Sequence, residues 1–130
     1  MASINLEKTL TVGPDAAWAV LSRTDRAHEA FPGVLTACEQ DGDSRTVTFA
    51  NGAVVKERIV DVDPVGRRIA YGVVEGRFVH HSASIQIVED GHGGSRFLWT
   101  SDFLPAEAAA MVGPLMEQGA EAFRRAVEAA

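Results

Sequence analysis

The sequence predicts an α+β fold in which one antiparallel sheet of seven strands curves around a long C-terminal helix. Turn residues recur about every 8 to 15 residues between 34 and 104, with no helical pattern between them. One strand and two short helices precede this region, and an amphipathic helix follows it. Because that helix is the only element long enough to cover the apolar face of the sheet, the sheet must wrap around it.

The N-terminal elements follow from alternation and capping. Residues 4–12 alternate between apolar and polar and predict the first strand. Pro14 and Asp15 suit the first turn of a helix over 16–22, because proline lacks an N–H that would need a partner there and the carboxylate meets the positive end of the helix dipole. A second short helix is expected over 26–30.

Six further strands follow as an antiparallel meander. Each is bounded by Gly, Asn, Asp or Pro, and Asn51-Gly52 is a typical two-residue hairpin turn. The expected strands are 34–40, 45–50, 53–62, 67–74, 78–89 and 95–104. With a closing helix over 106–130, these elements predict a helix-grip fold or half-open barrel.

The face that the closing helix should bury is made mainly of small side chains. At helical spacing it comprises Ala108, Val112, Leu115, Gly119, Ala122 and Ala126, with Met111 and Phe123 on its flanks. Small residues allow either a very close approach of the helix to the sheet or empty space beneath it. Since a strongly curved sheet cannot touch a straight helix along its whole length, we expect a cavity, where a ligand would bind.

Composition limits the classes of function. The chain has 130 residues, 46% of them hydrophobic and 23% charged, which predicts a single globular domain over 1–130. A net charge of −6 without a basic patch argues against nucleic acid and acidic membrane surfaces as partners. No apolar run is long enough for membrane insertion, and the N-terminus lacks a signal-peptide core. We therefore expect a cytoplasmic protein, either a monomer or a homodimer.

The single cysteine, Cys38, fits a reducing compartment, and we expect it to be a small apolar residue on a strand rather than a nucleophile.

Several short motifs resemble those of one protein superfamily. They are Pro14-Asp15-Ala16-Ala17-Trp18, Phe31-Pro32-Gly33-Val34, Asn51-Gly52 followed by Glu57, Asp63 with Arg68 and Tyr71, and Ser95-Arg96 before Trp99. With the order of elements, they make the chain similar to START/Bet v 1-like (SRPBCC) proteins, specifically the small bacterial polyketide cyclase/dehydrase-like members. The resemblance implies a helix-grip fold with a pocket for a hydrophobic ligand. Such proteins share no catalytic motif, so the resemblance leaves the reaction open.

Strand alternation selects the side chains that face the cavity, because the side-chain period of a strand is two. The expected ligand-binding residues on strands are Phe49, Val55, Glu57, Ile59, Tyr71, His81, Ala83, Phe97 and Trp99. Those on the closing helix are Met111, Leu115 and Gly119. The entrance is expected between the two short helices and the loops near 75–76 and 90–94.

Glu57 is the residue best suited to chemistry. Val55 and Ile59 face inward, so the carboxylate between them faces inward too, where desolvation raises its pKa and makes it usable as an acid or base. Tyr71 and His81 would share the cavity, and the three form the candidate catalytic set for proton transfer during cyclisation or dehydration. Alternatively, Glu57 is solvated, pairs with an arginine such as Arg77, or only orients a polar group of the ligand.

No metal or nucleotide cofactor is expected. His80 and His81 are adjacent on a strand and point to opposite faces, while His28 and His92 have no partner at a ligand spacing. His81 also fits an ordinary interior histidine. The glycine-rich segment 90–94 lacks the lysine and the following helix of a phosphate-binding loop.

Three functions fit these observations. The first is a binding or carrier module for a small hydrophobic molecule, such as a lipid, a polyketide or an aromatic metabolite. The second is a cyclase or dehydratase that uses Glu57 with Tyr71 or His81 as acid and base. The third is a protein-interaction domain, which would need an exposed apolar patch. A cone-shaped fold of the SnoaL type also encloses a pocket, but its long helices come first in the sequence.

Overall fold

The computed structural model describes residues 2–76 and 78–129, within which seven strands form one antiparallel sheet in the order β1-β7-β6-β5-β4-β3-β2. The elements are β1 (Ala2–Leu10), α1 (Pro14–Leu21), the 3-10 turn η1 (Thr24–Arg26), α2 (Ala27–Ala30), β2 (Leu35–Asp41), β3 (Ser44–Phe49), β4 (Val54–Asp63), β5 (Arg68–Val73), β6 (His80–Glu89), β7 (Ser95–Leu104), the 3-10 turn η2 (Ala106–Ala108) and α3 (Ala109–Glu128). The predicted fold is confirmed, with strand ends displaced by at most a residue or two.

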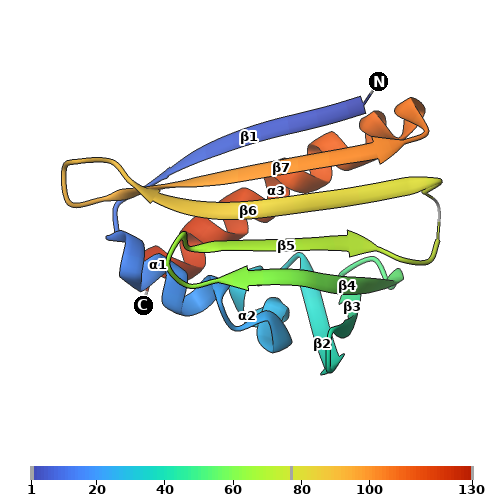
Figure 1. Cartoon of the computed structure of the whole chain (residues 1–130), viewed down its shortest axis with the longest axis horizontal. Coiled ribbons are helices and arrows are strands. Elements are labelled where there is room, and N and C mark those ends of the chain that lie inside the picture. Colours follow the sequence, from blue (N-terminus) through green and yellow to red (C-terminus); the bar gives the residue numbers. More distant parts are fainter. Residues whose placement is uncertain (1, 77, 130) are drawn as a thin grey trace.

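The sheet curves around α3. Figure 1 shows β2 and β3 turned steeply away from the direction of β5, β6 and β7, with α3 running behind the sheet toward α1. Register shifts between Leu35 and Ala37 in β2, and between Ile59 and Asp61 in β4, mark bulges, which bend a strand and increase its twist. A straight helix cannot remain in contact with a sheet bent in this way along its whole length.

The second half of α3, from Gly119 onward, packs on the main core. Phe123 is fully buried, and its ring centroid lies 4.8 Å from that of Phe97 and 5.8 Å from that of Phe31. Ala120 is fully buried as well, and α3 packs against β1, α1 and α2. This half of the helix therefore closes the core between the sheet and the N-terminal helices.

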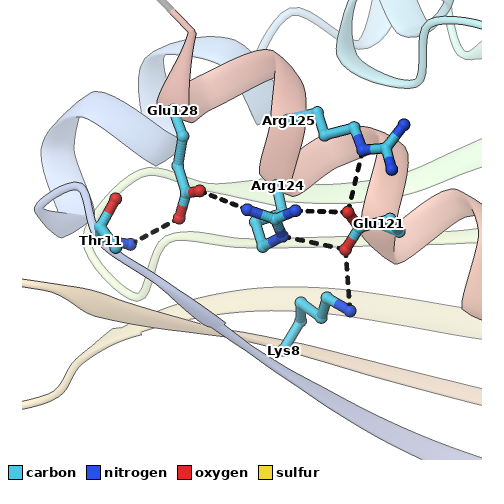
Figure 2. Close-up of polar contacts among 6 residues, drawn as sticks. All are labelled: Lys8, Thr11, Glu121, Arg124, Arg125 and Glu128. Atoms are coloured by element: carbon cyan, nitrogen blue, oxygen red, sulfur yellow. Dashed lines mark hydrogen bonds and ion pairs between the residues drawn. The ribbon is translucent and has the colours of Figure 1, made fainter.

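An ion pair with Lys8 of β1 and a hydrogen bond from Thr11, the residue after β1, hold the same half of α3 in place. Figure 2 shows Glu121 between Arg124 of its own helix and Lys8 of β1, whose Nζ lies 3.0 Å from Glu121 Oε1. Glu128 accepts a hydrogen bond of 2.9 Å from the backbone N–H of Thr11 and pairs with Arg124 at 2.5 Å. Partly exposed ion pairs of this kind contribute little to stability singly, but a network of them restricts where the helix can lie.

The buried face of α3 is rotated from the predicted stripe. The buried residues of α3 are Val112, Met116, Gly119, Ala120, Ala122, Phe123 and Val127. Leu115 and Ala126 are only half-buried, and Phe123 belongs to the face instead of its flank. The predicted stripe advances by an average of about 3.6 residues, the period of an α-helix, so its spacing is sound and the difference lies in its orientation: Met116 and Val127 are buried where Leu115 and Ala126 were expected. The prediction that this face consists mainly of small side chains is therefore wrong, because Val112, Met116, Phe123 and Val127 belong to it beside Gly119, Ala120 and Ala122.

Gly119 permits a close approach of α3 to the sheet. A Cβ atom at this position would lie 2.9 Å from Cζ3 and 3.1 Å from Cη2 of Trp99. Of the two explanations for a small residue, close approach applies here, because the Trp99 ring already fills the space. The empty space lies further toward the N-terminus of the helix.

Candidate functional site

A cavity of about 540 Å³ lies between the concave face of the sheet and the first half of α3. The helix lines it with residues between Met111 and Gly119, and strands β3 to β7 supply its floor. The segment from Leu21 to Phe31, which includes η1 and α2, supplies one wall. Ligand-binding cavities commonly measure about 300–1,000 Å³, so this volume suits a small organic molecule.

The exposed members of the lining mark the opening. They are Arg23, Asn51, Val54 at the start of β4, Glu75 and Gly76 in the segment between β5 and β6, and Met111, Pro114 and Gln118 of α3. The loop near 75–76, which was predicted to lie at the entrance, therefore borders the cavity. The loop 90–94 does not contribute to the lining, and Figure 1 shows the β6–β7 connection at the opposite end of the sheet from the β5–β6 connection. Its predicted place at the entrance is wrong.

Most of the expected ligand-binding residues line the cavity. They are Phe49, Val55, Glu57, Tyr71, His81, Trp99, Met111, Leu115 and Gly119. Ile59, Ala83 and Phe97 are buried in the core instead. Alternation identifies the face of a strand on which a residue lies, but not how far the cavity extends along that strand. Phe97 illustrates this, because it faces inward but packs on Phe123 beneath the second half of α3.

Glu57 forms a buried ion pair in the cavity wall. It lies directly across from Arg45 in the β3–β4 ladder, and the two residues are 8% and 6% exposed. Arg45 Nε and Nη2 both donate to Glu57 Oε1, at 3.0 Å and 2.6 Å, while Nη1 donates to the backbone carbonyl of Thr24 at 3.0 Å. Glu57 is therefore paired and not solvated. Arg77, the partner suggested from the sequence, lies outside the described residues.

Arg45 was missing from the residues expected at the site, although the sequence contained a signal for it. It is separated by an even number of positions from Val47 and Phe49 on the same strand, so alternation places it on the same inward face. A cation on that face, one hairpin turn away from an inward carboxylate, is a recognisable pair because neither charge is stable alone in an apolar cavity.

The electrostatic environment of Glu57 suits proton exchange. Burial raises the pKa of this carboxyl, and the nearby Arg45 guanidinium opposes the shift by charge attraction and hydrogen bonding. Among residues 2–76 and 78–129, none donates a hydrogen bond to Oε2, because both hydrogen bonds from Arg45 to the carboxylate end on Oε1. Glu57 thus keeps one acceptor oxygen for a bound molecule.

Tyr71 holds the floor of the cavity together. Trp99 Nε1 donates a hydrogen bond of 3.1 Å to its hydroxyl oxygen, and the Arg45 guanidinium carbon lies 5.5 Å from the centre of its ring. Burial, together with the Glu57 charge, raises the pKa of Tyr71, so the hydroxyl keeps its proton. In the described part of the chain, no acceptor takes that proton, which leaves Tyr71 a hydrogen-bond donor.

His81 is held by the protein at both ring nitrogens. The backbone N–H of Val73 donates to Nδ1 at 3.1 Å, so Nδ1 is unprotonated, and Nε2 lies 3.3 Å from Ser101 Oγ. Burial lowers the pKa of this imidazole, which agrees with the neutral form. His81 lines the cavity, but neither nitrogen is left to exchange a proton with a ligand.

Other reactive groups are sparse in the described ranges. There, no group of three His, Cys, Asp or Glu residues is arranged to hold a metal ion. Cys38 is half-buried and donates to the Thr24 carbonyl at 3.6 Å, and burial raises the pKa of its thiol. It is therefore a protonated thiol instead of a reactive thiolate. No helix within 2–76 and 78–129 has the length and apolar character needed to cross a bilayer.

Comparison with known proteins gives one family and several related structures. The family model described as polyketide cyclase / dehydrase and lipid transport matches residues 1–128. No curated protein gives a significant match.

Among solved structures, the protein XoxI from Bacillus cereus superimposes with a TM-score of 0.89 at 18% identity, covering 98% of this chain and 96% of that one. A protein from Thermobifida fusca gives 0.82 at 20% identity, with coverages of 98% and 93%. Norcoclaurine synthase from Thalictrum flavum, in complex with dopamine and hydroxybenzaldehyde, gives 0.75 at 22% identity, with coverages of 96% and 85%. These likenesses establish a shared fold.

Proposed function

We propose, since the chain belongs to the polyketide cyclase/dehydrase and lipid transport family, that it binds a small hydrophobic molecule in the cavity under the first half of α3. The cavity itself is the observation that carries the proposal. Its floor is built from apolar side chains such as Val47, Ile69 and Ile85, and the polar groups are confined to a few positions. That combination is typical of small-molecule sites.

The energetic cost of an empty cavity also supports the binding of a ligand there. Side chains that line an empty space lack partners for dispersion contacts on one side, so a cavity of this size lowers the stability of the unoccupied protein. A molecule that fills it restores those contacts and stabilises the folded state by mass action. Norcoclaurine synthase, which shares the fold, has been solved with two small aromatic compounds bound, and this supports a ligand of that general size.

The proposal is tested with a cavity-filling substitution. Val55 and Val60 both belong to β4, but Val55 lines the cavity whereas Val60 is 71% exposed on the other side. We expect Val55→Trp to fold and to lose binding of hydrophobic probes by at least about tenfold, because the indole occupies the site. Val60→Trp is the matched control and should bind as the original chain does.

Native mass spectrometry of the freshly purified protein completes the test, with a co-purifying small molecule expected on the original chain and on Val60→Trp only. Equal probe binding by Val55→Trp and Val60→Trp would contradict the proposal.

A second candidate function, proton-transfer catalysis, is favoured by the free Oε2 of Glu57 beside the protonated Tyr71. Glu57 would take a proton from the carbon next to a ligand carbonyl while Tyr71 hydrogen-bonds the carbonyl oxygen, and would return the proton to the rearranged product. The bonds of His81 to Val73 and Ser101 make it the weaker candidate. Glu57→Gln would then abolish turnover and retain binding, whereas a pure carrier has no turnover to lose.

A further inference from the structure

The two arginines that the structure describes at the cavity, Arg23 and Arg45, already interact with partners within the protein. Arg45 is the buried one, and each of its three guanidinium nitrogens donates to Glu57 or to the Thr24 carbonyl. Arg23, at the rim, has a side chain that is more than half exposed, and its Nε lies 3.6 Å from Asp25 Oδ1. No other lysine or arginine contributes to the lining formed by the described residues. Among the described residues, an anionic head group that entered the cavity would therefore find no unpaired positive charge.

The groups that remain available are neutral or negative. Glu57 Oε2 can accept a hydrogen bond, and the Tyr71 hydroxyl can donate one. They belong to neighbouring strands, where Tyr71 pairs with Ile59 and Glu57 lies two residues before Ile59 on the same face. Cross-strand diagonal neighbours of this kind lie within reach of one small ligand group. A ligand hydroxyl can satisfy both, because it donates one hydrogen bond and accepts another.

We propose that this cavity selects neutral apolar molecules that carry a hydroxyl group, such as phenols and alcohols, and rejects anionic amphiphiles such as fatty acids. The inference rests on the proposed function and adds the chemical class of the ligand. A carboxylate at the polar end would lie beside Glu57, where two negative charges repel each other strongly in a poorly solvated site. A hydroxyl brings no charge to desolvate and pairs the groups that the protein leaves open.

The selection is tested with three probes that share one ring system. Naphthalene has no polar group, 2-naphthol adds a neutral hydroxyl, and 2-naphthoate adds a carboxylate that is ionised at pH 7. Their dissociation constants are measured by calorimetric or fluorescence titration of the intact chain. We expect 2-naphthol to bind at least about tenfold more tightly than 2-naphthoate and several times more tightly than naphthalene.

Two variants identify the groups responsible. Glu57→Gln keeps the shape but removes the negative charge and leaves Arg45 uncompensated, so 2-naphthoate should bind at least about tenfold better than it does to the original chain and overtake 2-naphthol. The matched control is Glu7→Gln, which removes the acid of an exposed Glu–Arg pair between β1 and β7, with Arg96 Nη1 3.5 Å from Glu7 Oε1. It should leave all three constants unchanged. Tyr71→Phe should weaken 2-naphthol alone, and it remains informative if Glu57→Gln fails to fold.

The outcomes separate the two proposals. If no probe binds the original chain and Val55→Trp behaves identically, the cavity is not a ligand site and both proposals fail. If naphthalene and 2-naphthoate bind as tightly as 2-naphthol, the cavity is a ligand site but the selection for a neutral hydroxyl is wrong. Equal effects of Glu57→Gln and Glu7→Gln would also overturn the inference, because the discrimination would then arise from overall charge.

Discussion

The two halves of α3 face different surroundings, although they form one continuous helix. From Gly119 onward the helix rests on Phe97 and the N-terminal helices, and Figure 2 shows the polar contacts that tie it to β1. Before Gly119 it covers a cavity, and Met111 is exposed at the opening. The second half therefore carries the aromatic and polar anchoring contacts, whereas the first half encloses the site and adds Val112 and Met116 to the core, and substitutions in the two halves should have different consequences.

The largest difference in the loss of stability is expected between alanine variants of Phe123 and Leu115. Phe123→Ala removes a fully buried ring that contacts two other rings, and should lower the free energy of unfolding by about 3–5 kcal/mol. Leu115→Ala removes a half-buried side chain beside space that is already empty, and should cost less than about 1 kcal/mol while changing ligand affinity. Urea unfolding of both variants checks the comparison, which fails if the two losses are equal.

A smaller contrast is expected between two glycines of the helix. Gly119→Ala places a methyl group 2.9 Å from the Trp99 ring, and the resulting overpacking should lower stability by about 1–2 kcal/mol and reduce ligand affinity. At Gly113 the new methyl would meet only Ile4 Cδ1 among the described residues, at 3.8 Å, so Gly113→Ala should raise stability by up to about 1 kcal/mol through helix propensity. Thermal unfolding of both variants measures the contrast. A rise in melting temperature for both would contradict the prediction that the close approach at Gly119 leaves no room for a methyl group.

The smallest contrast concerns pH. The pKa of Glu57 is raised on folding, so its contribution to stability is present below the ordinary value of 4.5 and is lost as the pH rises through the folded value. The pKa of Glu121 is lowered by Arg124 and Lys8, so its contribution is present above 4.5 and is lost as the pH falls. Subtracting the stability curves of Glu57→Gln and Glu121→Gln from that of the original chain should give slopes of opposite sign.

The sequence predicts the fold well because its signals are local. Asn51-Gly52 and the other turns fix where the strands end, and alternation gives the inward face of each strand, including that of Glu57. The extent of the cavity, in contrast, is determined by contacts between residues that are far apart in the sequence. It depends on where α3 leaves the sheet, which is set by the contact of Gly119 with Trp99, two residues far apart in the chain.

The same limit applies to the candidate site. The inward direction of Glu57 follows from Val55 and Ile59, but its pairing with Arg45 depends on the register of β3 and β4. The bonding of His81 depends on Val73 N–H, a backbone group whose orientation no residue pattern reveals. Sequence therefore identifies the side chains that face inward, whereas tertiary structure decides which hydrogen bonds remain for a ligand.

Gly119 has a practical consequence for redesign. Because the anchoring contacts of α3 lie on one side of it and the roof of the cavity on the other, the pocket can be reshaped at Met111 and Leu115 without disturbing Phe123 or the Lys8–Glu121 pair. To change the ligand that binds, one would randomise the cavity-lining positions before Gly119 and leave the segment from Gly119 to Glu128 unchanged.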